Sequence, residues 1–157
     1  MRRLRLIIVT CGLVLAGAHT DPALGDERLQ GTWAIVAAEM RGKAVPAEAV
    51  KDARIVFTDK TMNTIVDGKT VSSFKYKVNA QAKPESIDFE GTEGLFKGQA
   101  QPAIFEVSGP EMKLCISPHR KDRPEAFRTE EGKDWHLLVL KREPPESPEP
   151  RNAADSR

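Results

Sequence analysis

The sequence has too few cysteines for a fold held by disulfides. Its two cysteines are Cys11 and Cys115, and Cys11 lies in an N-terminal segment that we expect to be removed. A single remaining cysteine excludes an intrachain disulfide, so the domain has to fold on its hydrophobic core alone. An unpaired thiol in an oxidising compartment usually persists by being buried, and we expect this of Cys115.

An excess of charge of one sign is also lacking. Removal of residues 1–25 takes away Arg2, Arg3, Arg5 and Asp21, which leaves 21 basic and 22 acidic residues from the 24 and 23 of the whole chain. The two signs are interspersed, and no block of like charge stands out. Nothing in this balance favours a nucleic acid or an anionic membrane surface as a partner.

Motifs of the common enzyme and nucleotide-binding families are missing as well. The sequence contains no Gly-x-Ser-x-Gly, no phosphate-binding loop and no dinucleotide fingerprint. Cys115 and His119, with Asp122 nearby, could form a metal site, and Cys115 with His119 or His136 could form an activated thiolate. A cysteine in an apolar strand is more often a buried, inert thiol. Asp88 and Glu90 share one face of a predicted strand, where alternation places both in solvent. We therefore predict a non-enzymatic protein without catalytic residues, metal or cofactor.

The sequence also lacks the apolar periodicity of amphipathic helices. Beyond the N-terminal segment, no stretch of ten or more residues repeats its apolar positions at the helical period. Short alternating runs separated by turn residues predict eight strands instead, over 31–39, 54–58, 61–66, 72–79, 86–90, 103–107, 111–117 and 135–142. Residues 45–51 form the best helix candidate, a short connector, Asp67-Gly68 indicates a hairpin, and the polar stretch 118–129 predicts an irregular loop.

Eight short strands with one dry and one wet face predict an all-β fold. A lipocalin-like antiparallel up-and-down barrel of about eight strands, with one short connector helix, meets this pattern and leaves no exposed edge. The apolar faces would then line its interior. Candidate lining residues are Trp33, Ile35, Ile55, Phe57, Phe74, Tyr76, Ile87, Phe89, Phe105, Leu114 and Leu137.

The two ends of the chain differ from this domain. Residues 1–5 are basic and residues 6–18 form an uncharged apolar run, shorter than the roughly 20 residues of a membrane-spanning helix. We expect 1–25 to be a signal peptide, cleaved after residue 18 or 25, and the mature protein to be exported to the periplasm or outside the cell without a membrane span. Domain 26–143 precedes a Pro- and Glu-rich tail, 144–157, which we expect to be solvated, the alternatives being a recognition motif or a tether.

Two hypotheses for the function stay open. Barrels of this size either fill their interior with side chains or hold one small ligand. In the first hypothesis the protein is an exported binding module that holds a small apolar or amphipathic ligand against Trp33, Phe57, Phe74, Tyr76, Phe105 and Leu114. In the second it is a structural or protein-interaction domain of the cell envelope with a solid core, whose protein partners the sequence does not name.

Several segments, taken in order, resemble a known family. They are residues 29–33, 41–48, 54–58, 112–115, 123–127 and 138–142. Together they resemble an uncharacterised lipocalin-like domain family expanded in planctomycete bacteria, over about residues 29–143. The resemblance implies an exported lipocalin-like barrel, and it implies no activity and no catalytic residues.

Gly31-Thr32-Trp33 also resembles the Gly-x-Trp signature that opens true lipocalins. In those proteins the Trp closes one end of the barrel and packs near a basic residue late in the last strand. The resemblance implies this structural role for Trp33, with Lys141 or Arg142 as the basic partner. A cation over an indole face stabilises by about 0.5–2 kcal/mol.

Overall fold

The computed structural model describes residues 26–119 and 122–145, which form nine strands and two single-turn 3₁₀ helices. The strands are β1 (Gly31–Met40), β2 (Lys43–Val45), β3 (Ala53–Phe57), β4 (Thr61–Val66), β5 (Lys69–Asn79), β6 (Ser86–Gly91), β7 (Ala100–Ser108), β8 (Glu111–Ile116) and β9 (His136–Arg142). The 3₁₀ helices are η1 (Ala47–Ala49) and η2 (Gly94–Phe96). The expected signal peptide lies outside the described residues, as does the tail beyond Pro145.

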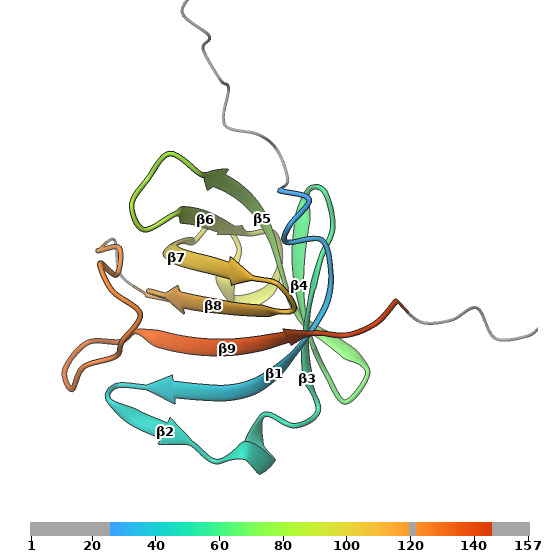
Figure 1. The fold of residues 1–157 in the computed structure, drawn as a ribbon, viewed down its shortest axis with the longest axis horizontal. Coiled ribbons are helices and arrows are strands. Elements are labelled where there is room, and N and C mark those ends of the chain that lie inside the picture. Colours follow the sequence, from blue (N-terminus) through green and yellow to red (C-terminus); the bar gives the residue numbers. More distant parts are fainter. Residues whose placement is uncertain (1–25, 120–121, 146–157) are drawn as a thin grey trace, which may run out of the picture.

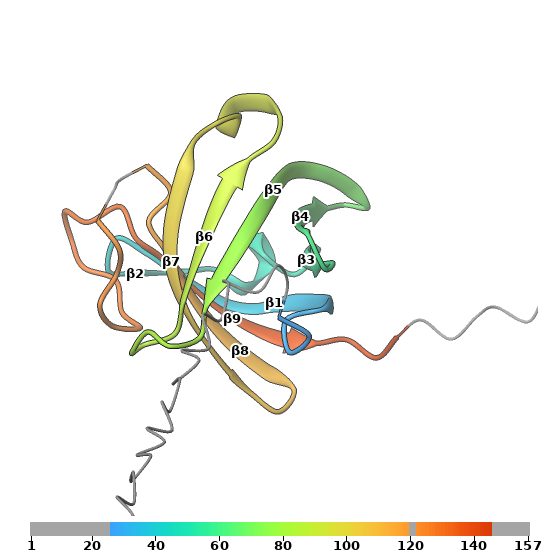
Figure 2. The same cartoon turned by 90° about the horizontal axis from the view of Figure 1, so that it is seen from above.

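The strands close into an antiparallel up-and-down barrel. β1 and β3–β9 pair with their neighbours in chain order, and β1 pairs with β9 to close the ring (Figures 1 and 2). The short β2 pairs with β1 alone and lies at its C-terminal end. The predicted all-β, lipocalin-like barrel of eight strands is therefore confirmed. Among the described residues, no helix has the length and apolar character needed to cross a bilayer.

Alternation along the strands decides which side chains enter the core. On β5, Phe74, Tyr76 and Val78 are buried, while Lys75 and Lys77 between them are exposed. β6 and β8 follow the same pattern, and the inward side chains of all eight barrel strands meet in one hydrophobic cluster. The barrel thus follows from a period of two residues, with one face turned from water.

The connections confirm one turn prediction and correct another. Asp67 and Gly68 both have positive φ, and they join Val66 to Lys69 in the tight hairpin that the sequence indicated. The predicted helix at 45–51 is reduced to the single turn of η1. Val45 pairs with Ala38 in β2, and after η1 the chain makes a separate turn, in which the Ala53 N–H donates to the Val50 carbonyl, so the helix does not continue.

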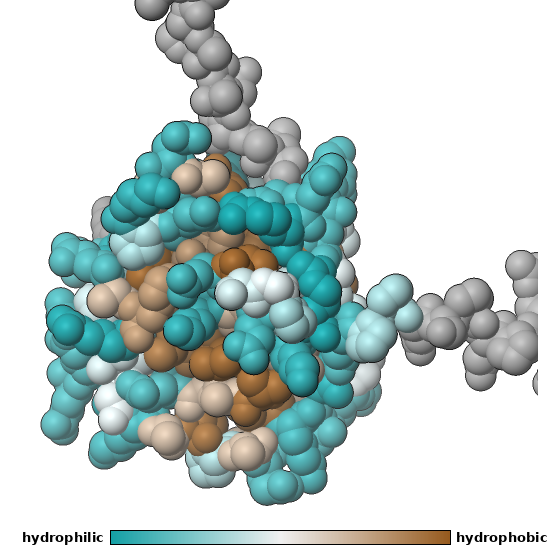
Figure 3. All heavy atoms as spheres, in the orientation of Figure 1, coloured by the Kyte–Doolittle hydropathy of each residue, from teal (hydrophilic) through white to brown (hydrophobic). Residues whose placement is uncertain are grey.

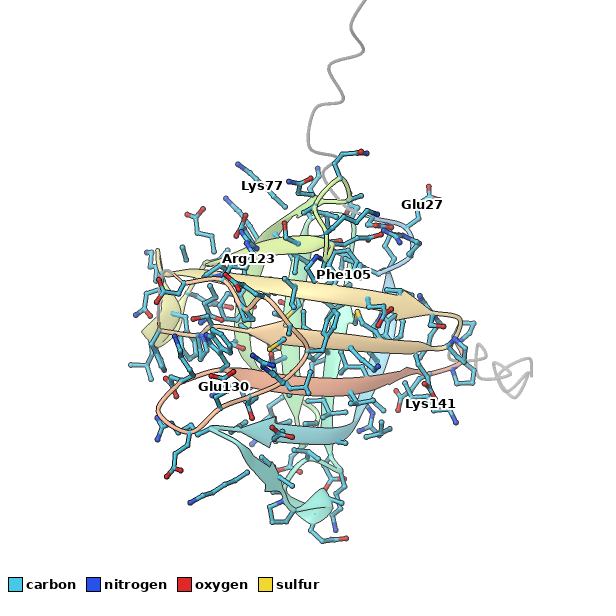
Figure 4. All side chains as sticks on the ribbon, turned by 60° about the vertical axis from the view of Figure 1, so that its left-hand side comes forward. Glu27, Lys77, Phe105, Arg123, Glu130 and Lys141 are labelled. Atoms are coloured by element: carbon cyan, nitrogen blue, oxygen red, sulfur yellow. The ribbon has the colours of Figure 1, made fainter. Side chains whose placement is uncertain are left out.

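The long β8–β9 connection is packed against the barrel wall. It runs back over the outside of the sheet, where Ile104, Cys115 and Trp135 form a second, smaller buried cluster. Figure 4 shows this connection crossing the outer face of the last strands. Partly buried Phe127 and Leu137 pack against the cluster.

Candidate binding surfaces

The interior of the barrel is occupied by aromatic rings in mutual contact. Phe57 lies edge-on to Tyr76 with ring centroids 5.4 Å apart, and Phe89 lies 6.1–6.4 Å from the rings of Phe57, Phe74 and Tyr76. Rings at such distances are in van der Waals contact. All six candidate ligand-binding residues belong to this cluster, with exposures of 0–4%.

One predicted lining residue, Leu137, faces the other way. It pairs with Cys115, and both side chains pack in the outer cluster, whereas the neighbouring Leu138 and Leu140 point into the barrel. β9 is apolar on both faces, so alternation could not show which of its residues face inward. The prediction that Leu137 lines the interior is therefore wrong. Ile35 is only partly buried at the edge of the core.

Trp33 and Arg142 close one end of the barrel. The Arg142 guanidinium carbon lies 4.1 Å from the centroid of the Trp33 ring, and both terminal nitrogens of Arg142 donate to the backbone carbonyls of Gln30 and Arg28. Trp33 Nε1 donates to the Leu29 carbonyl over 2.7 Å. Of the two basic candidates, the structure places Arg142 on the indole and leaves Lys141 exposed on the outer face.

The segment before β1 completes this closure. Leu29 is fully buried in the inner core, and the Arg28 guanidinium binds Asp26 and Glu85 at 2.5 and 2.6 Å. Burial by itself would raise the pKa of the Asp26 carboxyl, but hydrogen bonds from Arg28 outweigh it and hold that pKa below its usual value. This end of the barrel is therefore sealed by a plug of backbone and side chains.

The opposite end is covered by the β6–β7 loop. Phe96 of η2 packs on Phe74 with ring centroids 5.7 Å apart, and it stacks on His119 from the β8–β9 connection. The loop can come this close because residue 91 is glycine. A Cβ at Gly91 would lie 1.8 Å from the Phe96 carbonyl oxygen.

Burial changes the pKa of two of the groups that were considered for catalysis or metal binding. Cys115 is fully buried, and its Sγ lies 3.7 Å from the Arg128 carbonyl oxygen. Burial raises the pKa of its thiol to about 11, so the nucleophilic thiolate is disfavoured at neutral pH. Burial also lowers the pKa of His136. Within the described parts of the chain, no three His, Cys, Asp or Glu side chains are grouped closely enough to hold a metal ion.

Arg123 fastens the β8–β9 connection to the barrel wall. Its guanidinium donates to the carbonyls of Ala103 and Ile87 at 2.7 and 3.2 Å, and it pairs with Asp88 at 2.6 Å. Figure 4 shows Arg123 beside β7 on the outside of the barrel. Asp88, one of the two carboxylates on the wet face of β6, thus serves as an anchor for a loop.

An open groove of about 1090 Å³ lies beside this connection, on the outside of the barrel. One wall is the β5–β6 hairpin with Lys83 and Pro84, and the other is the connection itself, from Asp122 to Trp135. Its lining also contains the basic residues Arg123, Arg128 and Lys133 and the acidic residues Asp122, Glu125 and Glu130. The rim therefore carries both signs of charge around a partly apolar floor.

Trp135 gives this groove an unusual feature. Its side chain lines the groove and is 8% exposed, and its Nε1 has no hydrogen-bond partner among the described residues. The sequence does not reveal the groove or the place of Trp135 in it, because alternation predicts Trp135 in the last strand and the polar stretch 118–129 predicts only an irregular loop. Pro118, Pro124 and Phe127 were the available signal, since all three are buried or half-buried here.

Comparisons with known proteins add no relative. The sequence matches no protein-family model, and no curated protein is significantly similar to it. The fold described above defines the class, a lipocalin-like barrel, and a groove lies on its outer wall. The resemblance to the planctomycete family stays a hypothesis.

Proposed function

We propose that this chain is an exported, non-enzymatic interaction module in which the barrel is a solid scaffold and the binding surface lies on the outer wall. The observation that carries the proposal is the contact between the inward-facing rings of Phe57, Phe74, Tyr76 and Phe89. A ligand inside the barrel would have to displace these rings, and protein interiors packed in this way resist such changes.

The two barrel ends favour the same conclusion. Leu29 and Arg142 fill one end, and Phe96 covers the other. The hydroxyl of Tyr76, one of the candidate ligand-binding residues, donates to the Thr58 carbonyl over 2.5 Å. It is therefore already satisfied within the protein and is not left to recognise a ligand.

The outer surface is where the protein can contact another molecule. Figure 3 shows apolar groups reaching one face in separate patches between hydrophilic side chains. Surfaces that mix apolar patches with charged rims are typical of non-obligate protein contacts. Export is inferred from the basic and apolar N-terminal segment, and it predicts that the secreted protein starts at His19 or Asp26 when its intact mass is measured.

A titration with a neutral apolar dye tests the solid core. N-phenyl-1-naphthylamine fluoresces strongly in apolar sites, and we expect no saturable one-to-one binding to the mature protein. The Phe89→Ala variant, which empties about the volume of one benzene ring at the centre of the ring cluster, is the positive control for an internal cavity and should gain binding of benzene, followed as ligand-dependent thermal stabilisation. Saturable one-to-one binding to the unmodified protein would instead support the hypothesis of a ligand held inside the barrel.

A further inference from the structure

β9 turns a basic side chain toward the interior at each of its ends. Alternation along the strand gives His136 and Arg142 the direction of Leu138, which points into the barrel. Arg142 lies on the Trp33 ring and donates to two backbone carbonyls, so its charge is stabilised in place. His136 lies half-buried at the other end of the strand, and no hydrogen bond from the described residues holds its imidazole. The two ends of β9 therefore differ in their capacity to hold a positive charge.

The neighbours of His136 in the sheet are apolar. It pairs with Ile116 of β8 and with Met40 of β1, and Ile116 belongs to the inner core. A charged imidazole at this position loses part of its hydration without gaining a bonded partner. The closed barrel end therefore favours the neutral form of His136.

The charges that act on His136 come from the β1–β2 turn and the β8–β9 connection. Burial is the largest cause that lowers the pKa of His136, and the charges of His119 and Arg41 lower it further against the opposing effect of Asp134. The Asp134 carboxylate is shared, since it lies 2.9 Å from Arg41 and 3.9 Å from Nε2 of His119. The other titratable side chains near this rung lie on the outer face of the sheet or are exposed, namely Glu39, Cys115, Lys133, Lys43, Glu93 and Lys97.

We propose that His136 makes this end of the barrel sensitive to acid: when the imidazole takes up a proton, the first rung of β9 opens and the side chain turns out to water. The closed form lowers the pKa of His136, whereas an exposed imidazole keeps the usual pKa of about 6.5, so the open form binds the proton more tightly. The equilibrium therefore moves toward the open form as the pH falls below about 6.5. The open fraction rises by up to about tenfold for each unit by which the closed form lowers the pKa.

The first rung of β9 can open without the rest of the barrel. The pairs of His136 with Ile116 and Met40 are the last of the β8–β9 and β1–β9 ladders, where β9 meets the irregular connection (Figure 1). Beyond them the Arg41 N–H reaches the Trp135 carbonyl over 3.4 Å, the length of a weak hydrogen bond. Opening at a ladder end breaks few bonds and leaves the opposite end of β9 intact. The inference goes beyond the proposed function, because it concerns a barrel end and not the outer wall.

Amide hydrogen exchange of the mature protein, followed by NMR at about pH 7.5 and about pH 5, tests the opening. After correction for the intrinsic effect of pH on exchange, the protection of amides in residues 136–138 should fall by at least about threefold at the lower pH. Amides of residues 140–142, at the other end of the same strand, should keep their protection. Unchanged protection at both ends, or an equal loss at both, would overturn the proposal.

Two variants separate His136 from the other histidine of this end. His136→Gln removes the titrating group, so protection of 136–138 should be equal at the two pH values; His136→Met, which matches the neighbouring Met40, serves if the glutamine variant does not fold. His119→Gln is the matched control. It removes a charge that lowers the pKa of His136, so the loss of protection should persist but be smaller. A loss that survives both replacements of His136, or one that disappears in His119→Gln, would overturn the assignment to His136. The dye titration at neutral pH reports on the filled interior and is independent of these outcomes.

Discussion

The two tryptophans of this chain belong to two cores that are built differently. Trp33 is fully buried inside the barrel, with its Nε1 bonded to the Leu29 carbonyl and its ring covered by Arg142. Trp135 is almost as buried in the outer cluster, yet its Nε1 has no partner among the described residues. The inner core therefore satisfies the polar group of its tryptophan, whereas the outer core buries an indole N–H that the described residues leave unpaired.

The difference follows from what holds each core in place. Inner side chains project from strands whose register is set by backbone hydrogen bonds on both sides. The outer core is covered by an irregular connection, which Arg123 and Thr129 attach to the barrel through side-chain hydrogen bonds. Loops attached in this way open more easily than strands in a closed barrel. We therefore expect substitutions inside to cost more stability than those outside.

The largest effect should come from Phe89, at the centre of the inner rings. It is 1% exposed, and Phe89→Ala leaves a cavity among Phe57, Phe74 and Tyr76, so the free energy of unfolding should fall by about 3–5 kcal/mol. Urea unfolding followed by circular dichroism measures it. Leu95→Ala, at an 89% exposed site, is the control and should change stability by less than about 0.5 kcal/mol. A loss below about 1 kcal/mol for Phe89→Ala would contradict a tightly filled interior.

Alkaline pH should weaken both cores, at different pH values. Burial raises the pKa of Cys115, in the outer wall, from 9.0 to about 11, and that of Tyr76, in the barrel, from 10.0 to about 12. Because the unfolded chain releases each proton first, stability should fall from about pH 9 to 11 for the thiol and from about pH 10 to 12 for the phenol. Each loss is on the order of 2 kcal/mol when complete.

Two variants separate these contributions. Cys115→Ala should flatten the stability profile between about pH 9 and 10, and Tyr76→Phe should flatten only its more alkaline part. Urea unfolding across this range provides the measurement. If neither substitution changed the slope, neither buried acid would contribute to the loss of stability at alkaline pH.

The same two regions show how far the sequence could predict the structure. Phe74, Tyr76 and Val78 alternate with polar residues along β5, and this alternation alone predicts that their side chains point inward. β9 is apolar on both faces, and its register with β8, which turns Leu137 outward, depends on pairings that a single strand does not reveal. The groove could not be predicted from the sequence. It depends on where Arg123 attaches the β8–β9 connection to the barrel wall, and this connection has irregular backbone without a periodic pattern.

Arg142 tests whether the closed end of the barrel depends on one side chain. Arg142→Gln removes the cation from the Trp33 ring and leaves the carbonyls of Arg28 and Gln30 without their donors, so we expect a loss of about 1–3 kcal/mol. Denaturant unfolding followed by Trp33 fluorescence measures this loss. Lys141→Gln, the adjacent residue on the exposed face, is the matched control and should be nearly neutral. Equal effects of the two substitutions would show that the contact with Trp33 adds no stability.

The smallest expected effect is the one that separates the two cores most directly. Trp33→Phe removes a donor from the Leu29 carbonyl and leaves that buried acceptor unpaired, whereas Trp135→Phe removes a donor that has no partner among the described residues. Losing an unsatisfied polar group offsets part of the lost ring volume, so Trp135→Phe should cost less than about 1 kcal/mol and Trp33→Phe clearly more. Urea unfolding of both variants gives the comparison. A cost for Trp135→Phe equal to that for Trp33→Phe would mean that the outer indole N–H is hydrogen-bonded in solution, and the two cores would then not differ in this respect.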